Sequence, residues 1–591
     1  MMKNFIFSIL FFMSLMTSCY RSSNSNSATL EETMDAIVTR LYETLSSEQL
    51  DTIGTSWIIK QLAPEEKQVL ATKYLSFHVN TPVRVSLMRD KSQKVVPFWL
   101  ESTGFVLTDM VVRNSHSSYE VWQKDFDAGL VELGINGFDK HRPVYFISVG
   151  AQNPDRKLEI TNNFPEGQHF ERMAVGAFTY HDWDELTLEE VPDELVGQVL
   201  FTTIRGRARE AHLIGAFRTT PYPSGPEPDQ IMLSWVSDSS TSMDIRWRCN
   251  SSVTEGMVKY WESGTEDTLL AAANMKIMED RLLQNDRYVN CFTAHLDQLQ
   301  AGTQYFYQVG SEQGLWSATA SFQTEDKRDE NFSFIWFGDT HKSKHWGDLI
   351  QQSFQSFPDV AFYSIAGDLV STGLNRDDWD QLIHVSGPVF QYKPLMPVPG
   401  NHDSQDGLGA WMYQDIFSLP ENGPDGLSPE LSYSFMYKNA IFLMLDVTSP
   451  LELQSSWIEE QLSNSDALWK FAIFHFPPYN YEEDYSDIRK QWCTLFDTYH
   501  VDMVMSGHTH YYMRSLPIFK EELVEHHAQG TVYVISVGIP GNHENMPEEE
   551  YAEVRDGQGW LYQHMEIVGD RLIYKSLDIN GNIKDEFVIE K

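Results

Sequence analysis

Hydrophobic residues follow different spacings in successive stretches of the chain, and each spacing predicts a kind of element. In residues 30–77 apolar positions recur three or four residues apart, which predicts helices, and Pro64 stands near the first turn of one of them. In residues 79–218 and again in 230–309, short runs of alternating apolar and polar residues are divided by Gly, Pro, Asn and Asp. This alternation is typical of β-sandwich domains.

Beyond residue 330 the apolar runs become short and continuous, which predicts strands buried on both faces. Five such runs end in polar turn residues: 332–337, 360–366, 395–398, 471–474 and 503–505. Helical spacing is found at about 345–356, 376–386, 452–463 and 486–499, and later strands at 532–537, 560–567 and 572–577. We expect an α/β (α+β) four-layer sandwich with two mixed sheets and outer helices, preceded by two β-sandwich domains and an N-terminal helical segment.

Each of the five runs is followed by residues suited to binding metal ions. In chain order these clusters are Gly338-Asp339-Thr340-His341, Gly367-Asp368, Gly400-Asn401-His402-Asp403, His475 and Gly507-His508-Thr509-His510. In open α/β sheets, ligands gather where the carboxyl ends of strands meet loops, so the clusters should converge. Two carboxylates, one amide oxygen and several imidazoles suit a pair of iron, zinc or manganese ions.

A two-ion site of this composition predicts hydrolysis of phosphate esters. Ions about 3.5–4 Å apart need an anion between them, and Asp368 is the candidate bridge. Such a pair lowers the pKa of a shared water, so that the hydroxide between the ions is the nucleophile. A single Gly-Asp or Gly-Asn-His-Asp segment is more often a simple turn, but five clusters at strand ends are hard to obtain by chance. The chain shows no convincing nucleophile elbow.

The clusters resemble those of the calcineurin-like metallophosphoesterases, and within them the purple acid phosphatase branch. The resemblance covers roughly residues 222 to 591 and includes a turn at 299–307 that is similar to the fibronectin-like domain of that branch. It implies ligands for one metal at Asp339, His341 and His510, ligands for the other at Asn401, His475 and His508, and Asp368 between the two. His402 would stay unligated and would assist the leaving-group oxygen as proton donor or charge stabiliser.

Two departures limit what the resemblance implies. The branch places a Tyr three residues after the bridging Asp, whereas this chain has Ser371, so a purple iron(III)–tyrosinate is not expected. Where the family has Asp-x-Gly, this chain has Asp339-Thr340-His341, so His341 can replace the missing tyrosine as a metal ligand from a different loop. The segment 481–485 also lacks a further substrate-binding His and contains Glu482, Glu483 and Asp484, which would repel a phosphate dianion if they faced it. The choice of substrate therefore stays open.

The composition and the N-terminal segment indicate the number of domains, the excluded partners and the location of the protein. The chain has 591 residues, enough for three or four domains, and a formal charge of −40 argues against nucleic-acid or membrane binding through a basic face. Residues 1–18 predict a secretion signal, and Leu15-Met16-Thr17-Ser18-Cys19 resembles a bacterial lipobox, with 19–29 as a flexible tether. We expect a periplasmic or outer-membrane lipoprotein of a bacterium, anchored only through Cys19; the alternative is a soluble secreted form.

The expected domains are a helical segment (30–78), a β-sandwich of unknown role (79–218), a fibronectin type III-like domain (222–325) and the catalytic domain (330–591). Cys249 and Cys291 would either pair in an oxidising compartment or stay buried thiols. The expected enzyme is an acid-phosphatase-like phosphomonoesterase with a phosphate ester as its substrate. The alternatives are a phosphodiesterase or nucleotide hydrolase on the same site, and a surface-binding lipoprotein with a vestigial phosphoesterase domain.

Overall fold

The structure, a computed structural model, covers most of the chain. It describes residues 28–140, 144–165, 168–180, 186–204, 206–265, 267–312, 314–341, 343–404, 409–541 and 547–591. The predicted signal segment 1–18, Cys19 and most of the tether lie outside the described residues. In the described ranges, every helix is too short or too polar to cross a membrane.

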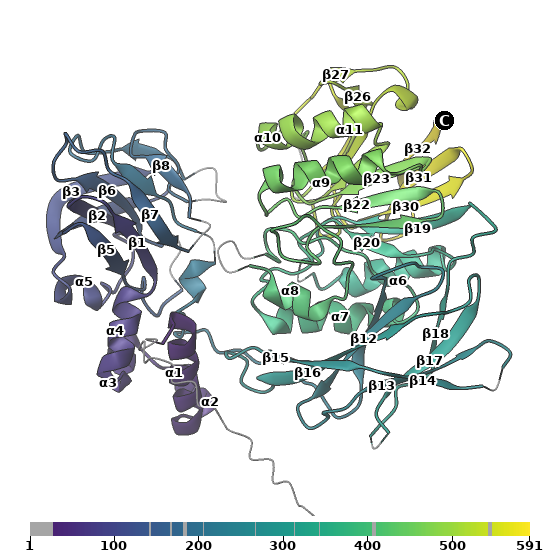
Figure 1. The fold of residues 1–591 in the computed structure, drawn as a ribbon, viewed down its shortest axis with the longest axis horizontal. Helices are drawn as coiled ribbons and strands as arrows, with labels where there is room; N and C mark the ends of the chain where they lie inside the picture. Colours follow the sequence, from purple (N-terminus) through teal and green to yellow (C-terminus); the bar gives the residue numbers. More distant parts are fainter. Residues whose placement is uncertain are drawn as a thin grey trace, which may run out of the picture.

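The N-terminal part combines helices with two sheets around one core (Figure 1). Its helices are α1 (Leu30–Thr44), α2 (Ser47–Leu50), α3 (Thr55–Gln61), α4 (Pro64–Thr72) and α5 (Trp99–Ser102). The smaller sheet has the order β5 (Gly129–Leu133), β1 (Leu75–Val79), β7 (Ile160–Phe164). The larger sheet has the order β8 (Phe170–Arg172), β10 (Val199–Phe201), β6 (Phe146–Ala151), β2 (Val83–Asp90), β4 (Ser118–Phe126), β3 (Val106–Asn114), β9 (Leu188–Glu190).

Local chemistry sets the helix boundaries in this part. The Thr29 hydroxyl accepts a hydrogen bond from the backbone N–H of Glu32, and the backbone N–H of Thr29 donates to the Glu32 carboxylate, a capping box that begins α1. Pro64 occupies the first turn of α4, as the sequence predicts. The expected helical segment 30–78 ends earlier, at Thr72, because residues 75–79 form β1 and pair with both β5 and β7.

The middle domain consists of two four-stranded antiparallel sheets. One has the order β11 (Asp229–Ser234), β12 (Met243–Asn250), β16 (Tyr288–Leu296), β15 (Asn274–Glu279), and the other β14 (Leu269–Ala272), β13 (Met257–Glu262), β17 (Gln304–Gly310), β18 (Ala320–Gln323). Cys249 lies opposite Asn290, and Cys291 opposite Arg248. Directly opposed residues share a face and consecutive residues alternate, so the two thiols point to opposite faces and stay unpaired.

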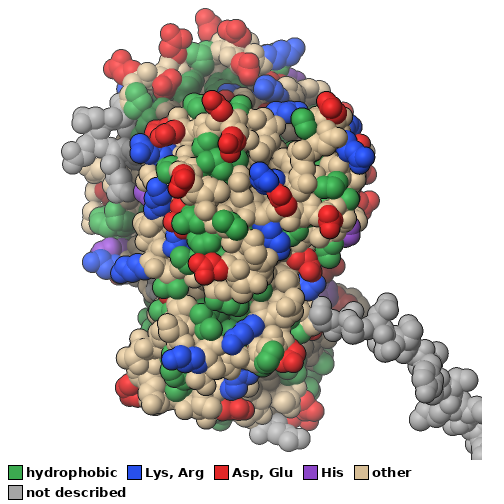
Figure 2. Space-filling model, turned by 90° about the vertical axis from the view of Figure 1, so that its left-hand side faces the viewer, with side chains coloured by type: hydrophobic (Ala, Val, Ile, Leu, Met, Phe, Trp, Pro, Cys, Tyr) green, Lys and Arg blue, Asp and Glu red, His purple; other side chains and the backbone are tan. Residues whose placement is uncertain are grey.

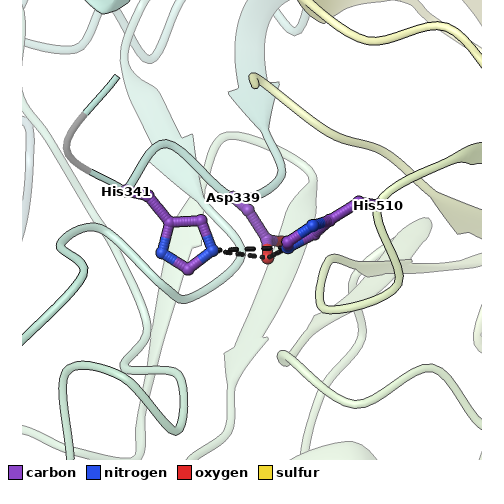
Figure 3. Close-up of side chains that lie close together, drawn as sticks. All are labelled: Asp339, His341 and His510. Atoms are coloured by element: carbon purple, nitrogen blue, oxygen red, sulfur yellow. Dashed lines mark hydrogen bonds and ion pairs between the residues drawn. The ribbon is translucent and has the colours of Figure 1, made fainter. Parts of the chain in front are cut away.

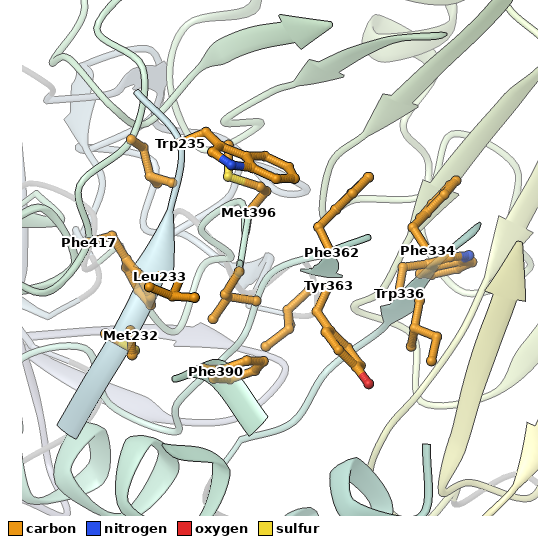
Figure 4. Close-up of a cluster of buried hydrophobic side chains, with 14 of the residues drawn as sticks. Met232, Leu233, Trp235, Phe334, Trp336, Phe362, Tyr363, Phe390, Met396 and Phe417 are labelled. Atoms are coloured by element: carbon orange, nitrogen blue, oxygen red, sulfur yellow. The ribbon is translucent and has the colours of Figure 1, made fainter. Parts of the chain in front are cut away.

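The middle domain and the catalytic domain share a hydrophobic core. Met232, Leu233 and Trp235 of the first sheet pack toward Phe362, Met396 and other apolar side chains of the catalytic domain (Figure 4). Trp235 stacks on Tyr437 with ring centroids 5.4 Å apart. Because the apolar surface of one domain is buried by the other, the two domains form a continuous hydrophobic unit.

The catalytic domain contains two mixed sheets with helices outside, as expected (Figure 1). One sheet has the order β20 (Tyr363–Ile365), β19 (Phe332–Phe337), β30 (Leu561–Val568), β31 (Arg571–Asp578), β32 (Ile583–Glu590). The other has the order β21 (Tyr433–Tyr437), β22 (Ala440–Met444), β23 (Trp469–Ile473), β24 (Met503–Ser506), β28 (Val532–Ile535), β25 (Tyr512–Ser515), β29 (Ala552–Asp556). The helices are α6 (Trp346–Ser356), α7 (Arg376–Phe390), α8 (Trp411–Ile416), α9 (Leu451–Ser463), α10 (Ser486–Ile488) and α11 (Thr494–Tyr499).

Two elements differ from the expectation. Residues 395–398 lie parallel to β20 and form two isolated bridges with it, in which Met396 and Val398 donate their N–H groups to the carbonyls of Tyr363 and Ile365. The expected helix 486–499 is divided by a π-helical stretch, Arg489–Cys493, between α10 and α11. The remaining runs with metal-ligand clusters form strands close to their predicted positions.

Buried ion pairs join the parts of the chain next to the catalytic domain. We call this set the junction network; its members are Arg218, Asp229, Arg248, Asp280, Asp286, Arg376, Asp377 and Asp380. Arg218, at the end of the N-terminal part, pairs with Asp280 of the middle domain and with Asp377 of α7, the latter at 2.8 Å. Asp280 also accepts the backbone N–H of Arg376. The network therefore holds the first turn of α7, which directly follows the loop from Asp368 to Asn375.

The outer face of the N-terminal part carries charges of both signs. Figure 2 shows Lys and Arg interspersed with Asp and Glu on that face, with apolar side chains between them. The view shows no continuous basic surface there.

Candidate metal centre

The predicted ligands stand on loops at the carboxyl ends of neighbouring strands. Asp339 follows β19, Asp368 follows β20, His475 follows β23 and His508 follows β24. Three of the predicted ligands have a left-handed backbone, with φ of 42° at His341, 49° at Asp368 and 73° at His508. Non-glycine residues adopt this conformation at a cost, and such strain clusters at functional sites.

Asp339 stands between two imidazoles. Its Oδ2 lies 3.2 Å from Nε2 of His510 and 3.5 Å from Nε2 of His341, and the rings point toward it (Figure 3). Its other oxygen, Oδ1, accepts the backbone N–H of His508 at 2.6 Å. The carboxylate is thus fixed by one oxygen and presents the other to the two histidines.

Asp368 repeats this arrangement at the centre of the site. Its Oδ1 accepts the backbone N–H of His402 at 2.8 Å. Its Oδ2 lies 3.2 Å from Nε2 of His475, 3.7 Å from Nε2 of His341 and 3.9 Å from Nε2 of His402. One oxygen therefore faces imidazoles from both predicted half-sites, which is the position that a bridging ligand needs.

Glycines allow these loops to approach so closely. A Cβ added at Gly400 would meet the backbone and carboxylate of Asp368, and one at Gly507 would meet Oδ1 of Asp339. Gly367, with φ of 87°, leaves no room for a side chain beside His475. Gly367, Gly400 and Gly507 are thus required by packing within the centre.

Asp403 ties the loop of Asp368 to the loop of Asn401. It accepts backbone N–H groups from Leu369, Val370 and Gly400 at 2.9–3.0 Å. Burial and the charge of Asp368 raise the pKa of Asp403 to about 7, although the three N–H donors oppose this. Asn401 is buried, and its chain neighbours Gly400 and His402 both touch Asp368.

Two further histidines contact Asp368 or its neighbours with defined ring orientations. His475 donates Nδ1–H to the carbonyl of Ala366 at 2.8 Å, so that Nε2 is the nitrogen that faces Oδ2 of Asp368. His402 contacts the carbonyl of Ser371 through Nδ1 at 2.7 Å and keeps a third of its side chain exposed. His508 lies beside His475, with ring centroids 5.0 Å apart.

The electrostatics of the centre reflect strong mutual attraction. Burial lowers the pKa of His341 and of His475, but the carboxylates Asp339 and Asp368 outweigh burial and raise both values to about 9. Burial raises the pKa of Asp339 and of Asp368, but the histidines hold both well below the usual range. Both carboxylates are therefore ionised at neutral pH and available to bind cations.

The donor set fits metal ions. Asp339, His341 and His510 form one group of potential ligands, and Asp368, His475 and His508 form another. A third group, His341, Asp368 and His402, lies between them. Oδ2 of Asp339 and Nε2 of His475 are buried without a hydrogen-bond partner among the described residues. Such orphaned acceptors, all of kinds that bind iron, zinc or manganese, are expected where ions complete the polar contacts.

The structure brings seven of the eight predicted site residues of the catalytic domain into one place: Asp339, His341, Asp368, His402, His475, His508 and His510. Sequence reasoning missed two that touch the centre: Glu483 and Tyr485 contact Nε2 of His508. It treated the acidic run 482–484 as a potential repulsive surface, but only Glu483 turns inward, whereas Asp484 pairs with Arg489. No spacing pattern in the sequence distinguishes Glu483 from its acidic neighbours Glu482 and Asp484.

Two mixed sheets with carboxylate and imidazole clusters at their strand ends are typical of the metal-dependent hydrolases. Residues 228–324 match the model of the purple acid phosphatase N-terminal domain, and residues 332–512 match the calcineurin-like phosphoesterase model. The chain thus contains a calcineurin-like phosphoesterase domain, preceded by a domain that matches the N-terminal domain of purple acid phosphatases.

Similar proteins agree with this assignment. Purple acid phosphatase 23 of Arabidopsis thaliana is 25% identical over 54% of this chain and 78% of its own length. An uncharacterized protein of Mycobacterium tuberculosis is 25% identical over 50% of this chain, and the match spans 63% of that relative. The structure of purple acid phosphatase PPD1 from yellow lupin (Lupinus luteus) seeds is similar in fold, with a TM-score of 0.54, 14% identity, and coverage of 88% of this chain and 91% of that one.

Proposed function

We propose that this protein hydrolyses phosphate esters at a two-ion centre and that phosphomonoesters are its preferred substrates. The observation that carries the proposal is the position of Asp368 Oδ2, within 3.2–3.9 Å of imidazole nitrogens from three different loops. The names of similar proteins support the monoester preference, among them phosphoenolpyruvate phosphatase of Allium cepa.

The centre offers two ion positions with a shared carboxylate. Asp339, His341 and His510 would hold one ion, Asn401, His475 and His508 the other, and Asp368 both. When bound, such a pair supplies hydroxide at neutral pH and neutralises charge on the phosphoryl group. One relative is named an Fe(3+)-Zn(2+) purple acid phosphatase, but Ser371 stands where the branch has its tyrosine, so we propose a colourless centre of iron, zinc or manganese.

His402 is proposed to assist the leaving group. The contact of its Nδ1 with the Ser371 carbonyl holds the ring so that Nε2 faces the side of Asp368 Oδ2, 3.9 Å away. One third of the His402 side chain is exposed, unlike the buried His475, so a substrate can reach it. A protonated Nε2 there can donate to the oxygen that leaves phosphorus.

Hydrolysis of p-nitrophenyl phosphate and of bis(p-nitrophenyl) phosphate by the ion-loaded protein tests this proposal. We expect a higher kcat/KM for the monoester, and loss of activity in Asp368→Asn. The control is Asp487→Asn, an equal charge change at a side chain that is 79% exposed. Inactivity of the wild-type protein on both esters contradicts the proposal, and preference for the diester overturns its monoester part.

We also propose that the protein is exported and carries a lipid at Cys19. Its substrates would then be phosphate esters outside the cytoplasm, and nucleic acids would not be its partners. The apolar run before Cys19 and the charge of −40 support this. Incorporation of labelled palmitate into the wild-type chain and its loss in Cys19→Ser test the attachment. Equal labelling of both forms would show that another residue, or none, carries the lipid.

A further inference from the structure

The segment after His475 folds over the outer side of His508. Phe476 lies against the His508 ring, with centroids 4.6 Å apart, and stacks on Tyr485 at 5.0 Å with nearly parallel planes. This aromatic pair brings the acidic segment back toward the centre. As a result, Nε2 of His508 lies 3.2 Å from Oε2 of Glu483 and 2.9 Å from Oη of Tyr485.

Glu483 is an acceptor in this arrangement. Its Oε2 lies against Nε2 of His508, and a glutamate carboxyl group is ordinarily ionised at neutral pH. The hydroxyl of Tyr485 donates to the same Oε2. An ionised carboxylate accepts hydrogen bonds and donates none, so the proton between Glu483 and His508 belongs on Nε2 of the imidazole.

The neighbouring ligand His475 shows the opposite ring orientation. Its Nδ1–H donates to the Ala366 carbonyl, and Nε2 faces Asp368. In His508 the engaged nitrogen is Nε2, which leaves Nδ1 as the acceptor for an ion. Both rings thus reach the same centre through different nitrogens. The outer partner of His475 is a neutral carbonyl, whereas that of His508 carries a full negative charge.

We propose that Glu483 is a positioning residue of the metal centre: it accepts the Nε2 proton of His508, fixes the tautomer that presents Nδ1, and increases the basicity of that nitrogen. Outer carboxylates on metal-binding histidines act in this way and are typically worth 10- to 100-fold in metal affinity. The inference rests on the proposed function, since it concerns one of the two ion positions of that centre. It also assigns the inward acidic group a role toward an ion rather than toward the substrate.

Binding of Zn²⁺ to the full chain tests the proposal, measured by competition with a chromophoric chelator after the resident ions are removed. We compare the wild type with Glu483→Gln and Glu483→Ala. The amide oxygen of Gln can still accept the Nε2 proton but without charge, so the affinity for one Zn²⁺ should fall about 10-fold in Gln and up to about 100-fold in Ala. The affinity for the other ion should change less than about twofold, because Glu483 contacts only the His508 side.

Glu482→Gln is the matched control, an equal change of charge at the adjacent exposed position, and its affinities should equal those of the wild type. Thermal unfolding of each ion-free variant checks that the fold is retained. Wild-type affinity for both ions in Glu483→Ala overturns the proposal, and so does an equal loss of both ions accompanied by a lower Tm. A wild-type chain that binds no Zn²⁺ would instead contradict the proposed function itself.

Discussion

Two clusters of buried charge in this protein differ in how their charges are balanced. In the junction network each carboxylate has an arginine partner: Arg248 lies 2.6 Å from Asp229 and 2.5 Å from Asp380, and Arg376 lies 2.7 Å from Asp286. In the metal centre the carboxylates face only imidazoles, which are neutral in their ordinary ligand form. The carboxylates of the first cluster are balanced by arginines at every relevant pH, whereas those of the second are balanced by imidazoles that must lose their protons when they bind metal ions.

This difference separates the charges that stabilise the fold from the charges that bind external ligands. Arginine guanidinium groups stay charged at all relevant pH values and form fixed forks with carboxylates, so the junction network orients the domains and the start of α7. Imidazoles give up their proton to bind an ion, so the metal centre keeps acceptors for external ligands. Loss of a charge should therefore reduce stability in the junction network and reduce ion binding in the metal centre.

The largest effect is expected for Asp368→Asn. The amide has the shape of the carboxylate but no charge, so neither ion position keeps its bridging anion. We expect kcat/KM for p-nitrophenyl phosphate to fall by about 10,000-fold, which corresponds to about 5.5 kcal/mol. The ion-free variant should stay folded with a lower Tm, because the attraction between Asp368 and the surrounding imidazoles is lost while the cost of burying the charge is also removed. A variant that unfolds would show that Asp368, like the charges of the junction network, is required for the stability of the fold.

Arg248→Met should give the reverse result. The substitution leaves Asp229 and Asp380 without their shared cation, and breaking a buried pair costs about 3–5 kcal/mol of unfolding free energy. We expect a marked fall in Tm with kcat per folded molecule within about twofold of the wild type. Arg571→Met is the control, because its pair with Glu590 is half exposed and should contribute less than about 1 kcal/mol. Equal Tm values for the two variants would contradict the comparison.

His402→Ala refines the account of the metal centre. The loss of a general acid should lower kcat by about 100-fold, or about 2.7 kcal/mol, for esters with basic leaving groups. For p-nitrophenyl phosphate, whose leaving group needs less protonation, the loss should be smaller. Ion content should remain that of the wild type. A loss of ions in this variant would make His402 a ligand rather than a proton donor.

The smallest effect concerns pH. His341 and His475 have pKa values of about 9 against an ordinary 6.5, so their protonation stabilises the ion-free fold fully below pH 6.5. That stability is lost as pH rises through 9. We expect Tm of chelator-treated protein to fall between pH 6.5 and 9 relative to the ion-loaded protein, in which these imidazoles are already neutral. A difference in Tm that does not vary across this window would contradict the pKa shifts.

The sequence predicts the metal centre much better than it predicts the junction network. Every cluster of predicted metal ligands follows a short apolar run, so position in the hydrophobic pattern indicates function. The junction network joins Arg218, Asp280 and Arg376, and no spacing links residues from three parts of the chain. Glu483 was missed for the same reason, since the aromatic contacts that turn it inward depend on tertiary packing.

The most direct test of the account is the number of metal ions per chain, measured by elemental analysis of the purified wild-type protein after incubation with zinc, iron or manganese and removal of unbound ions. We predict two ions per folded chain, and at most one in Asp368→Asn. A wild-type chain that stays folded and retains none would contradict the account, because the acceptors of Asp339 and His475 would then be buried without a partner for another reason.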